Sequence, residues 1–175
     1  MQHGAGLPLI RAVNGFDSRL RYVETINEFK GNTFFLSNFY VGKPIHYGVF
    51  DYASGEHLFN ALKTVNLKEQ EWVRSAPTPG EAKKRGRQVN LRPNWDNDIR
   101  YKAMRAVVGR KFMQDWSLAV NLYITFDAEL IEGNTWHDNV WGNCTCGRAA
   151  CEVEGQNHLG KLLMEYRDNV IGKWM

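Results

Sequence analysis

The pattern of apolar residues changes near Ser54, and this change limits the fold more than any other feature of the 175-residue sequence. Before it, short aromatic and β-branched runs are broken by Gly and Pro, which is typical of strands joined by turns. After it, apolar residues mostly recur every three or four positions, which indicates helices. The expected strands lie within residues 22–29, 33–40, 43–54 and 128–134, and the expected helices within 54–68, 78–89, 94–115, 117–126 and 155–174. The sequence therefore predicts an α+β fold, a predominantly helical single domain with a small antiparallel sheet.

The domain organisation is simple. Residues 1–21 carry scattered Gly, Pro and charged residues and are predicted to form an N-terminal arm. Residues 22–175 are predicted to form one domain, because no shift in composition divides them and a 43% hydrophobic content can supply one sizeable core.

Composition and charge limit the functional classes. The chain has no apolar run of the length that a membrane span needs and no signal-peptide pattern, so we expect a cytoplasmic protein without a membrane partner. Its net charge of +3 does not by itself indicate nucleic-acid binding, although it suits an anionic substrate such as a nucleotide. The basic run KKRGR is expected to be a solvated helix face.

The stretch SGEHLFNALKT, residues 54–64, raises the question of why charged residues share a helix face with apolar ones. Ser54 is a suitable N-cap. Glu56 and Lys63 are seven residues apart, nearly two helical turns, so in a continuous helix they share a face with Phe59. Burying a carboxylate and an ammonium costs free energy unless they are paired or used. Either both charges snorkel to water from a surface helix, or the helix lines a pocket and presents an acid and an amine to a substrate.

The stretch WHDNVWG, residues 136–142, brings another carboxylate close to tryptophans. Trp136, Asp138 and Trp141 lie in one short polar loop, where two rings can stack on a planar base while the acid forms a hydrogen bond. The alternative is a loop that its tryptophans anchor to the core.

Two helix starts also carry candidate residues. Asp96, next to Trp95, is expected to be the N-cap of the helix in 94–115. Gly155 and Asn157 lie at the entrance of the last helix, where backbone N–H groups could hold a phosphate, although a plain N-cap is the more common role.

Three cysteines, Cys144, Cys146 and Cys151, lie close together in the sequence. Without a secretory signal they argue against a disulfide framework. Their C-x-C-x4-C spacing is not a standard zinc pattern, and a fourth ligand would have to be His137 or His158. We therefore assign no metal ligand and no cofactor, and leave a structural metal open beside free loop cysteines.

Several stretches resemble the NADAR family, the YbiA-like proteins, in order and spacing. The matching stretches are FLSNFY, PIHYGVFDYASGEHLFNALK, AKKRGRQVNLRPNWDNDIRYKAM, LIEGNTWHDNVWG and GQNHLGKLLMEYR. The resemblance covers about residues 29–168, and the ordered set of stretches is specific where any single motif is not. The segment CTCGRAACEVE departs from the family, which more commonly has a short Gly- and Asp-rich connection there.

The resemblance implies an N-glycosidase, a hydrolase that cleaves the bond between a base and ribose. Some members of the family act on phosphorylated ribosylamino-pyrimidine intermediates of riboflavin synthesis, and others remove ADP-ribose from modified guanine in nucleic acid. The implied substrate is a phosphorylated nucleoside-like molecule, with ADP-ribosylated DNA or nucleotide among the candidates. The alternative is a non-catalytic module that binds ADP-ribose or another NAD derivative.

On matching positions, the resemblance also implies site residues. The implied catalytic residues are Glu56, Lys63 and Asp138, and the implied substrate-binding residues are Asn38, Arg85, Trp95, Trp141, Gly142 and Asn157. The two acids would stabilise an oxocarbenium-like ribose and handle the proton of the leaving base. The lysine would contact a phosphate or hydroxyl, or attack C1′ of the opened ribose as a neutral amine and form a Schiff base. Because this chemistry uses no metal-bound water, we expect no metal in the active site.

Overall fold

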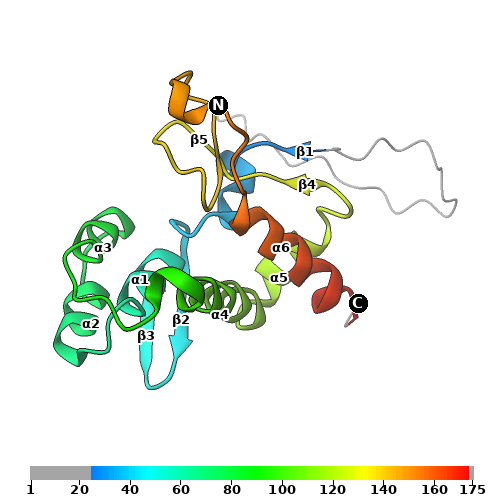
Figure 1. The fold of residues 1–175 in the computed structure, drawn as a ribbon. Helices are drawn as coiled ribbons and strands as arrows, with labels where there is room; N and C mark the ends of the chain where they lie inside the picture. Colours follow the sequence, from blue (N-terminus) through cyan, green and yellow to red (C-terminus); the bar gives the residue numbers. More distant parts are fainter. Residues whose placement is uncertain (1–24, 174–175) are drawn as a thin grey trace, which may run out of the picture.

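Helices form most of the regular structure in residues 25–173, the part of the chain that the computed structural model describes (Figure 1). The predicted arm, residues 1–21, lies outside this part. The α-helices are α1 (Gly55–Ala61), α2 (Leu67–Arg74), α3 (Pro79–Arg85), α4 (Arg100–Met113), α5 (Trp116–Tyr123) and α6 (His158–Asn169). Shorter helical segments are the 3-10 turns η1 (Gly31–Leu36), η3 (Ala149–Cys151) and η4 (Ile171–Lys173), and the π-helical turn η2 (Trp95–Ile99).

The strands form three separate pairs. The hairpin of β2 (Val41–Tyr47) and β3 (Phe50–Ser54) is antiparallel and turns at Gly48, whose φ of +64° suits glycine. This hairpin confirms the predicted antiparallel sheet. The other two pairs are parallel and join distant segments: β1 (Thr25–Ile26) with β4 (Glu129–Leu130), and β5 (Gly133–Asn134) with β6 (Asn143–Cys144).

Helix α4 is the central element of the core. It contacts α1, α5, α6 and β2, and Figure 1 shows α1 to α3 on one side of it and α5 and α6 on the other. Leu58 of α1, Val107 of α4 and Leu163 of α6 are fully buried. Burial of a side chain of this size contributes about 1.5–3 kcal/mol, so the core fixes α1, which carries one wall of the site described below.

The starts of two helices agree with the sequence. Ser54 is the N-cap of α1, and its Oγ accepts a hydrogen bond from the N–H of His57. Thr78 caps α3 in the same way, with Pro79 at the first helical position, where its missing N–H costs nothing.

Helix α1 ends earlier than the prediction of 54–68. Its last residue is Ala61, and Asn66 begins a new helix because its side chain accepts hydrogen bonds from the N–H groups of Lys68 and Glu69. Lys63 therefore lies in a turn, and the expectation that it shares a continuous helix with Glu56 is wrong.

Two other predictions of local structure are also wrong. Residues 33–40 were expected to be a strand, but the segment starts with η1, because the Thr33 hydroxyl bonds to the nearby backbone of Glu28 and Lys30 and so favours a local turn. Asp96 is not a helix cap: Asn94, in the left-handed conformation with φ of 59°, precedes the π-helical turn instead.

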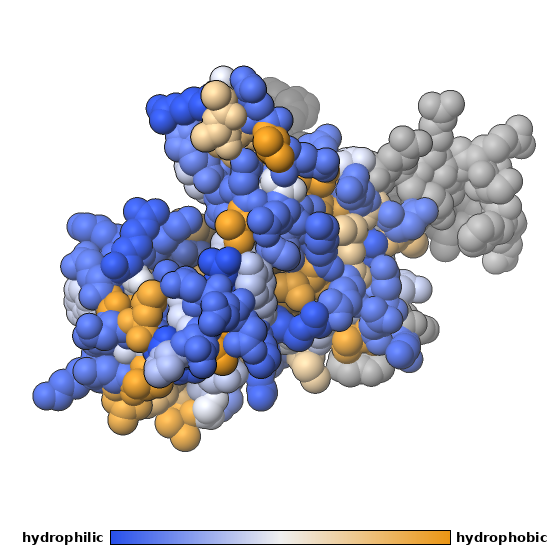
Figure 2. Space-filling view, viewed as in Figure 1, coloured by the Kyte–Doolittle hydropathy of each residue, from blue (hydrophilic) through white to orange (hydrophobic). Residues whose placement is uncertain are grey.

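The surface in Figure 2 shows hydrophobic residues in several separate patches divided by hydrophilic ones. Within residues 25–173, no helix has both the length and the apolar content required to cross a membrane.

Candidate active site

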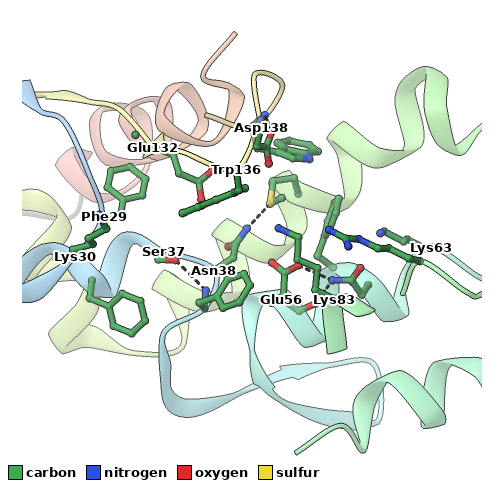
Figure 3. A pocket seen from close by; sticks show the side chains of 18 residues that line it. Phe29, Lys30, Ser37, Asn38, Glu56, Lys63, Lys83, Glu132, Trp136 and Asp138 are labelled. Atoms are coloured by element: carbon green, nitrogen blue, oxygen red, sulfur yellow. Dashed lines mark hydrogen bonds between the residues drawn. The ribbon is translucent and has the colours of Figure 1, made fainter. Parts of the chain in front are cut away.

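A cavity of about 620 Å³ lies between α1 and the loop that joins β5 to β6 (Figure 3). This volume is within the usual range for sites that bind small molecules. Acids, cations and aromatic rings line it together. The acids are Glu56, Glu132 and Asp138, the cations are Lys30, Lys63, Lys83 and Arg87, and the rings belong to Phe29, Phe34, Phe39, Phe59, Trp136 and Trp141.

Glu56 lies in the first turn of α1 and is only 7% exposed. Its N–H donates to the carbonyl oxygen of Asn38 at 2.9 Å, and its Oε1 accepts from Asn60 Nδ2 at 2.9 Å. Burial raises the pKa of Glu56, and the positive charge of Lys83 opposes this shift in part. The carboxyl group is therefore held in place and favours its protonated form more than an ordinary glutamate does.

Lys63 reaches the same cavity from the turn after α1. Its Nζ lies 5.6 Å from the centre of the Phe59 ring. Burial lowers the pKa of Lys63, and the nearby Glu56 acts in the opposite direction. Of the two interpretations of this stretch, the structure agrees with the pocket: both charged side chains line one cavity.

Glu132, between β4 and β5, is the third acid of the site. Its side chain is partly exposed and lines the cavity. Burial raises the pKa of Glu132 to about 8, and the negative charges of Asp138 and Glu56 add to the shift. Three carboxyl groups this close cannot all ionise easily, so the cavity retains a proton near neutral pH.

Hydrogen bonds to asparagine and aspartate side chains hold the loop that carries Asp138. Asp138 Oδ1 accepts from the N–H groups of Val140 and Trp141, at 3.2 and 2.9 Å. The buried Asn134 side chain accepts from Asp138 N at 3.1 Å and donates to Asp138 O at 2.7 Å. Figure 3 shows Glu132, Trp136 and Asp138 on one side of the cavity, opposite Asn38, Glu56 and Lys83.

The tryptophans of this loop differ in their surroundings. Trp136 is 56% exposed and presents a ring to the cavity. Trp141 packs against Phe59 and Tyr101, with ring centres 5.4 and 5.6 Å apart, so it both lines the cavity and anchors the loop. Trp136 is therefore the ring that is free to stack on a planar ligand.

Five of the residues implied by the resemblance meet in the cavity lining: Asn38, Glu56, Lys63, Asp138 and Trp141. Arg85 and Trp95 do not line it. The Arg85 guanidinium donates to Trp72 O at 2.6 Å and to Glu81 Oε1 at 3.3 Å. Trp95 is buried against Phe59, with ring centres 5.4 Å apart.

Gly142 and Asn157 also lie outside the lining, and both contact the backbone around Glu132. A Cβ on Gly142 would lie 2.1 Å from Glu132 O, so this close approach requires glycine. Asn157 Oδ1 accepts from Glu132 N at 3.1 Å, and its Nδ2 donates to Leu130 O at 2.8 Å. The geometry makes them positioning residues for the acid.

Sequence reasoning missed Glu132, Lys83 and Arg87. Glu132 lies within residues 128–134, for which the sequence predicts a strand and no site residue. Lys83 belongs to the KKRGR run, but residues two apart on a helix point in different directions, so Lys83 faces the cavity while Arg85 does not. Only the direction of α3 relative to the cavity, a tertiary property, distinguishes them.

The side chains that could bind a metal ion lie outside the cavity. Among residues 25–173, the side chains whose ligand atoms are close enough together to hold a metal ion are His137, Cys144, Cys146 and Cys151. None of them lines the cavity.

The fold and the cavity define a class of small α+β domains in which a helix and a loop enclose buried carboxyl groups, amines and aromatic rings. The chain belongs to the NADAR family, because the NADAR domain matches residues 26–171. This confirms the resemblance seen in the sequence.

Relatives with known names agree with this family. N-glycosidase YbiA of Shigella flexneri serotype 5b (strain 8401) is 35% identical over 136 residues, which cover 77% of this chain and 79% of the relative. A riboflavin biosynthesis protein of Vibrio vulnificus is 34% identical over 138 residues, which cover 78% of this chain and 35% of that protein. The NMR structure of the Escherichia coli protein YbiA superposes with a TM-score of 0.73 at 30% identity and covers 89% of this chain and 92% of YbiA. It confirms the predicted α+β fold.

Proposed function

We propose that this protein is an N-glycosidase that hydrolyses the bond between ribose C1′ and a base nitrogen of a phosphorylated nucleoside-like substrate. The observation that carries the proposal is the meeting of three carboxyl groups with amines and aromatic rings in one cavity, where burial raises the pKa of Glu56 and Glu132. The relatives named N-glycosidase support the same reaction class.

Glu56 is the proposed proton donor to the base. As the C1′–N bond breaks, its electron pair passes to the base nitrogen, which takes the proton of the Glu56 carboxyl group. A carboxyl group whose burial favours the protonated form is suited to this step at neutral pH.

Asp138 is the proposed partner on the opposite wall. Its carboxylate stabilises the positive charge that develops on the ribose and then accepts a proton from the water that adds to C1′. The hydrogen bonds from Val140 and Trp141 fix its direction before the substrate binds. Glu132 retains a proton beside it and so limits the negative charge of the site.

The cations and the exposed tryptophan ring of the cavity are proposed to bind the phosphate and the base of the substrate. Lys83 and Arg87 line the cavity and would bind phosphate oxygens, whereas Arg85, an implied substrate-binding residue, lies outside the lining. Trp136 would stack on the base, and Asn38 would contact a hydroxyl group or the base edge.

Lys63 supports a second route for substrates in which ribose is attached to an exocyclic amine. Burial lowers its pKa, which increases the neutral amine fraction. Its Nζ would attack C1′ of the opened sugar and displace the amine of the base, and water would then hydrolyse the resulting Schiff base. Borohydride added during turnover should reduce this intermediate to a stable adduct on Lys63, and turnover without any adduct would exclude the route.

Two substrate types are candidates. A second hollow, of about 310 Å³, adjoins the cavity and shares Lys30, Gly133 and Trp136 with it. A long substrate such as ADP-ribose on guanine, in DNA or as a nucleotide, would extend into this hollow. The riboflavin biosynthesis relative favours a phosphorylated ribosylamino-pyrimidine instead.

A cytoplasmic location remains a prediction from the sequence.

Turnover by purified protein tests the proposal. Both substrate types are incubated with the wild type, and mass spectrometry measures the released base together with ribose phosphate from the pyrimidine substrate or ADP-ribose from the guanine substrate. We expect catalytic conversion of one of them. Micromolar binding of ADP-ribose without conversion of either substrate would instead identify a binding module.

A further inference from the structure

We propose that His137, Cys144, Cys146 and Cys151 form a structural zinc site that holds the loop carrying Trp136 and Asp138 against the cavity. These four residues are called the Cys–His cluster below. The sequence left a structural metal open without choosing its fourth ligand, and the structure selects His137. The proposal does not depend on the glycosidase assignment, because metal content is measured without a substrate.

The distances within the Cys–His cluster suit tetrahedral coordination. Nδ1 of His137 lies 3.3 Å from Cys146 Sγ and 3.4 Å from Cys151 Sγ, and all four ligand atoms lie within 4.8 Å of one another. A tetrahedral zinc ion with Zn–S near 2.3 Å and Zn–N near 2.0–2.1 Å places its ligand atoms about 3.5–3.8 Å apart. Small side-chain movements therefore suffice to close the site.

The ligand set favours zinc over the other common cations. Three thiolates and one imidazole are typical of structural zinc sites, whereas calcium and magnesium prefer oxygen ligands. Binding converts the three thiols to thiolates and releases their protons to the solvent, while His137 coordinates in its neutral form.

His158, the other candidate, has different partners. Its Nε2 bonds to Gln156 Oε1 at 2.8 Å, and its ring packs against Tyr101 and Trp141. It is absent from the group of side chains that could share a metal ion.

Two residues in or next to the Cys–His cluster have a positive φ. His137 has a positive φ of 68°, which is uncommon for a residue other than glycine, and its N–H donates to Cys144 Sγ at 3.3 Å. Gly147, just after Cys146, has a φ of 77° and turns the chain back toward Cys151. These two positive φ values bring the backbone of both segments close to the same group of ligand atoms.

The segment from Thr145 to Gly155 needs an anchor of this kind. Every residue in it except Cys146, Cys151 and Gly155 is exposed, so the segment contributes nothing to the hydrophobic core. Short segments that cannot bury apolar surface are commonly held by metals or disulfides. The three thiols of this chain are free, which leaves them available as metal ligands.

The site is placed to act on the cavity indirectly. His137 lies between Trp136 and Asp138, both in the cavity lining, and Cys144 belongs to β6, which pairs with β5. A metal on these ligands would tie together the two ends of the loop. The Cys–His cluster itself is outside the lining, so its residues are positioning residues rather than catalytic ones.

Metal analysis of protein purified without added metal tests the proposal. We expect about one zinc per chain together with three thiols that react only after zinc is displaced. Cobalt substituted for zinc should give the visible absorption bands of tetrahedral thiolate coordination. A disulfide between any two of the cysteines, or protein that holds no zinc even after reconstitution under reducing conditions, would overturn the site.

Variants locate the metal. Cys146→Ser and His137→Ala should each lower the zinc content at least tenfold after dialysis against a chelator, whereas Thr145→Ala and His158→Gln should retain it. Hydrogen exchange in residues 134–151 should become faster in the wild type when zinc is removed, and exchange in α4 should not change. Full zinc in His137→Ala together with loss in His158→Gln would contradict the assigned ligand. If a variant fails to fold, the thiol count and the cobalt spectrum of the wild type still decide the question.

Discussion

The two walls of the cavity are built in different ways. The helix wall, residues 55–63, starts at a capped N-terminus and is fixed by the packing of Leu58 in the core. The loop wall, residues 131–142, contains only the two-residue strand β5 and turns, and asparagine and aspartate side chains hold it together. The core therefore fixes the positions of the reacting groups on the helix wall. Close backbone contacts and hydrogen bonds fix the positions of those on the loop wall.

This difference predicts how substitutions act. A change of a reacting group on the helix wall should remove chemistry and leave the fold intact. A change on the loop wall should alter the positions of Glu132 and Asp138 together, because Asn134, Gly142 and Asn157 hold the backbone around these acids.

The largest effect is expected for Glu56→Gln. It should lower kcat by about 10²–10⁴-fold, because it removes the proton donor, and it should leave ligand affinity and Tm close to the wild type. The matched control is Glu71→Gln on α2, whose exposed carboxylate pairs with Arg74 and lies outside the cavity lining. A variant with a rate within threefold of the wild type would remove Glu56 from the mechanism.

Gly142→Ala should have the next largest effect. The new methyl group would meet Glu132 O at 2.1 Å, and the resulting shift of the loop wall should lower kcat/KM by about 10²-fold. Gly80→Ala is the control, because its nearest neighbour is 3.9 Å away and alanine favours the helix there. Equal activity of the two variants would show that the loop wall tolerates displacement.

Trp136→Ala should weaken ligand binding by about 5- to 150-fold, since stacking of a base on an aromatic ring contributes about 1–3 kcal/mol. Its Tm should remain unchanged because the ring is mostly exposed. Trp141→Ala is the matched comparison: it loses contacts with Phe59 and Tyr101, so its Tm should fall by roughly 6–12 °C. Calorimetric titration with ADP-ribose measures the binding and thermal unfolding measures Tm. A lower Tm in Trp136→Ala together with an unchanged Tm in Trp141→Ala would contradict this account.

The smallest expected effect is the contribution of Glu132 to the pH dependence of folding stability. Its folded-state pKa of about 8 exceeds the ordinary value of 4.5, so the folded protein binds an extra proton between these values. This contribution to stability is complete below pH 4.5 and is lost as the pH rises to 8. Lys111, with a folded-state pKa lowered to about 7, has the opposite effect only above pH 7.

Glu56, whose pKa is also raised, contributes in the same direction between pH 5 and 7, and a comparison of Glu132→Gln with the wild type cancels this shared contribution. Glu132→Gln should gain a few degrees in Tm relative to the wild type as the pH rises through this range. Glu129→Gln, an exposed neighbour, should keep a constant difference from the wild type. A Tm difference for Glu132→Gln that does not change with pH would mean that the Glu132 carboxyl group is ionised throughout this range.

The structure of the helix wall can be predicted from the sequence, because the residues that determine it are close together in the chain. The Ser54 cap and the spacing of apolar residues predict α1, and the positions of Glu56 and Lys63 on an apolar stretch suggest a pocket. The end of the helix was misjudged, because the side chain of Asn66 starts a new helix there.

The loop wall was less predictable because its determinants are distant in the sequence. Asn157 contacts the backbone of Glu132 across 25 residues, and β1 pairs with β4 across more than 100. Sequence reasoning found Asp138 and the tryptophans through their residue types but could not place Glu132 opposite Glu56.

The central claim is that both walls form a single site. A crystal structure of Glu56→Gln with an uncleaved substrate tests it most directly, because this variant should bind without turnover. The account predicts ribose C1′ in the cavity, about 3–3.5 Å from a water that donates a hydrogen bond to Asp138, with the base nitrogen facing residue 56. A substrate bound outside the cavity, or in contact with only one wall, would contradict it.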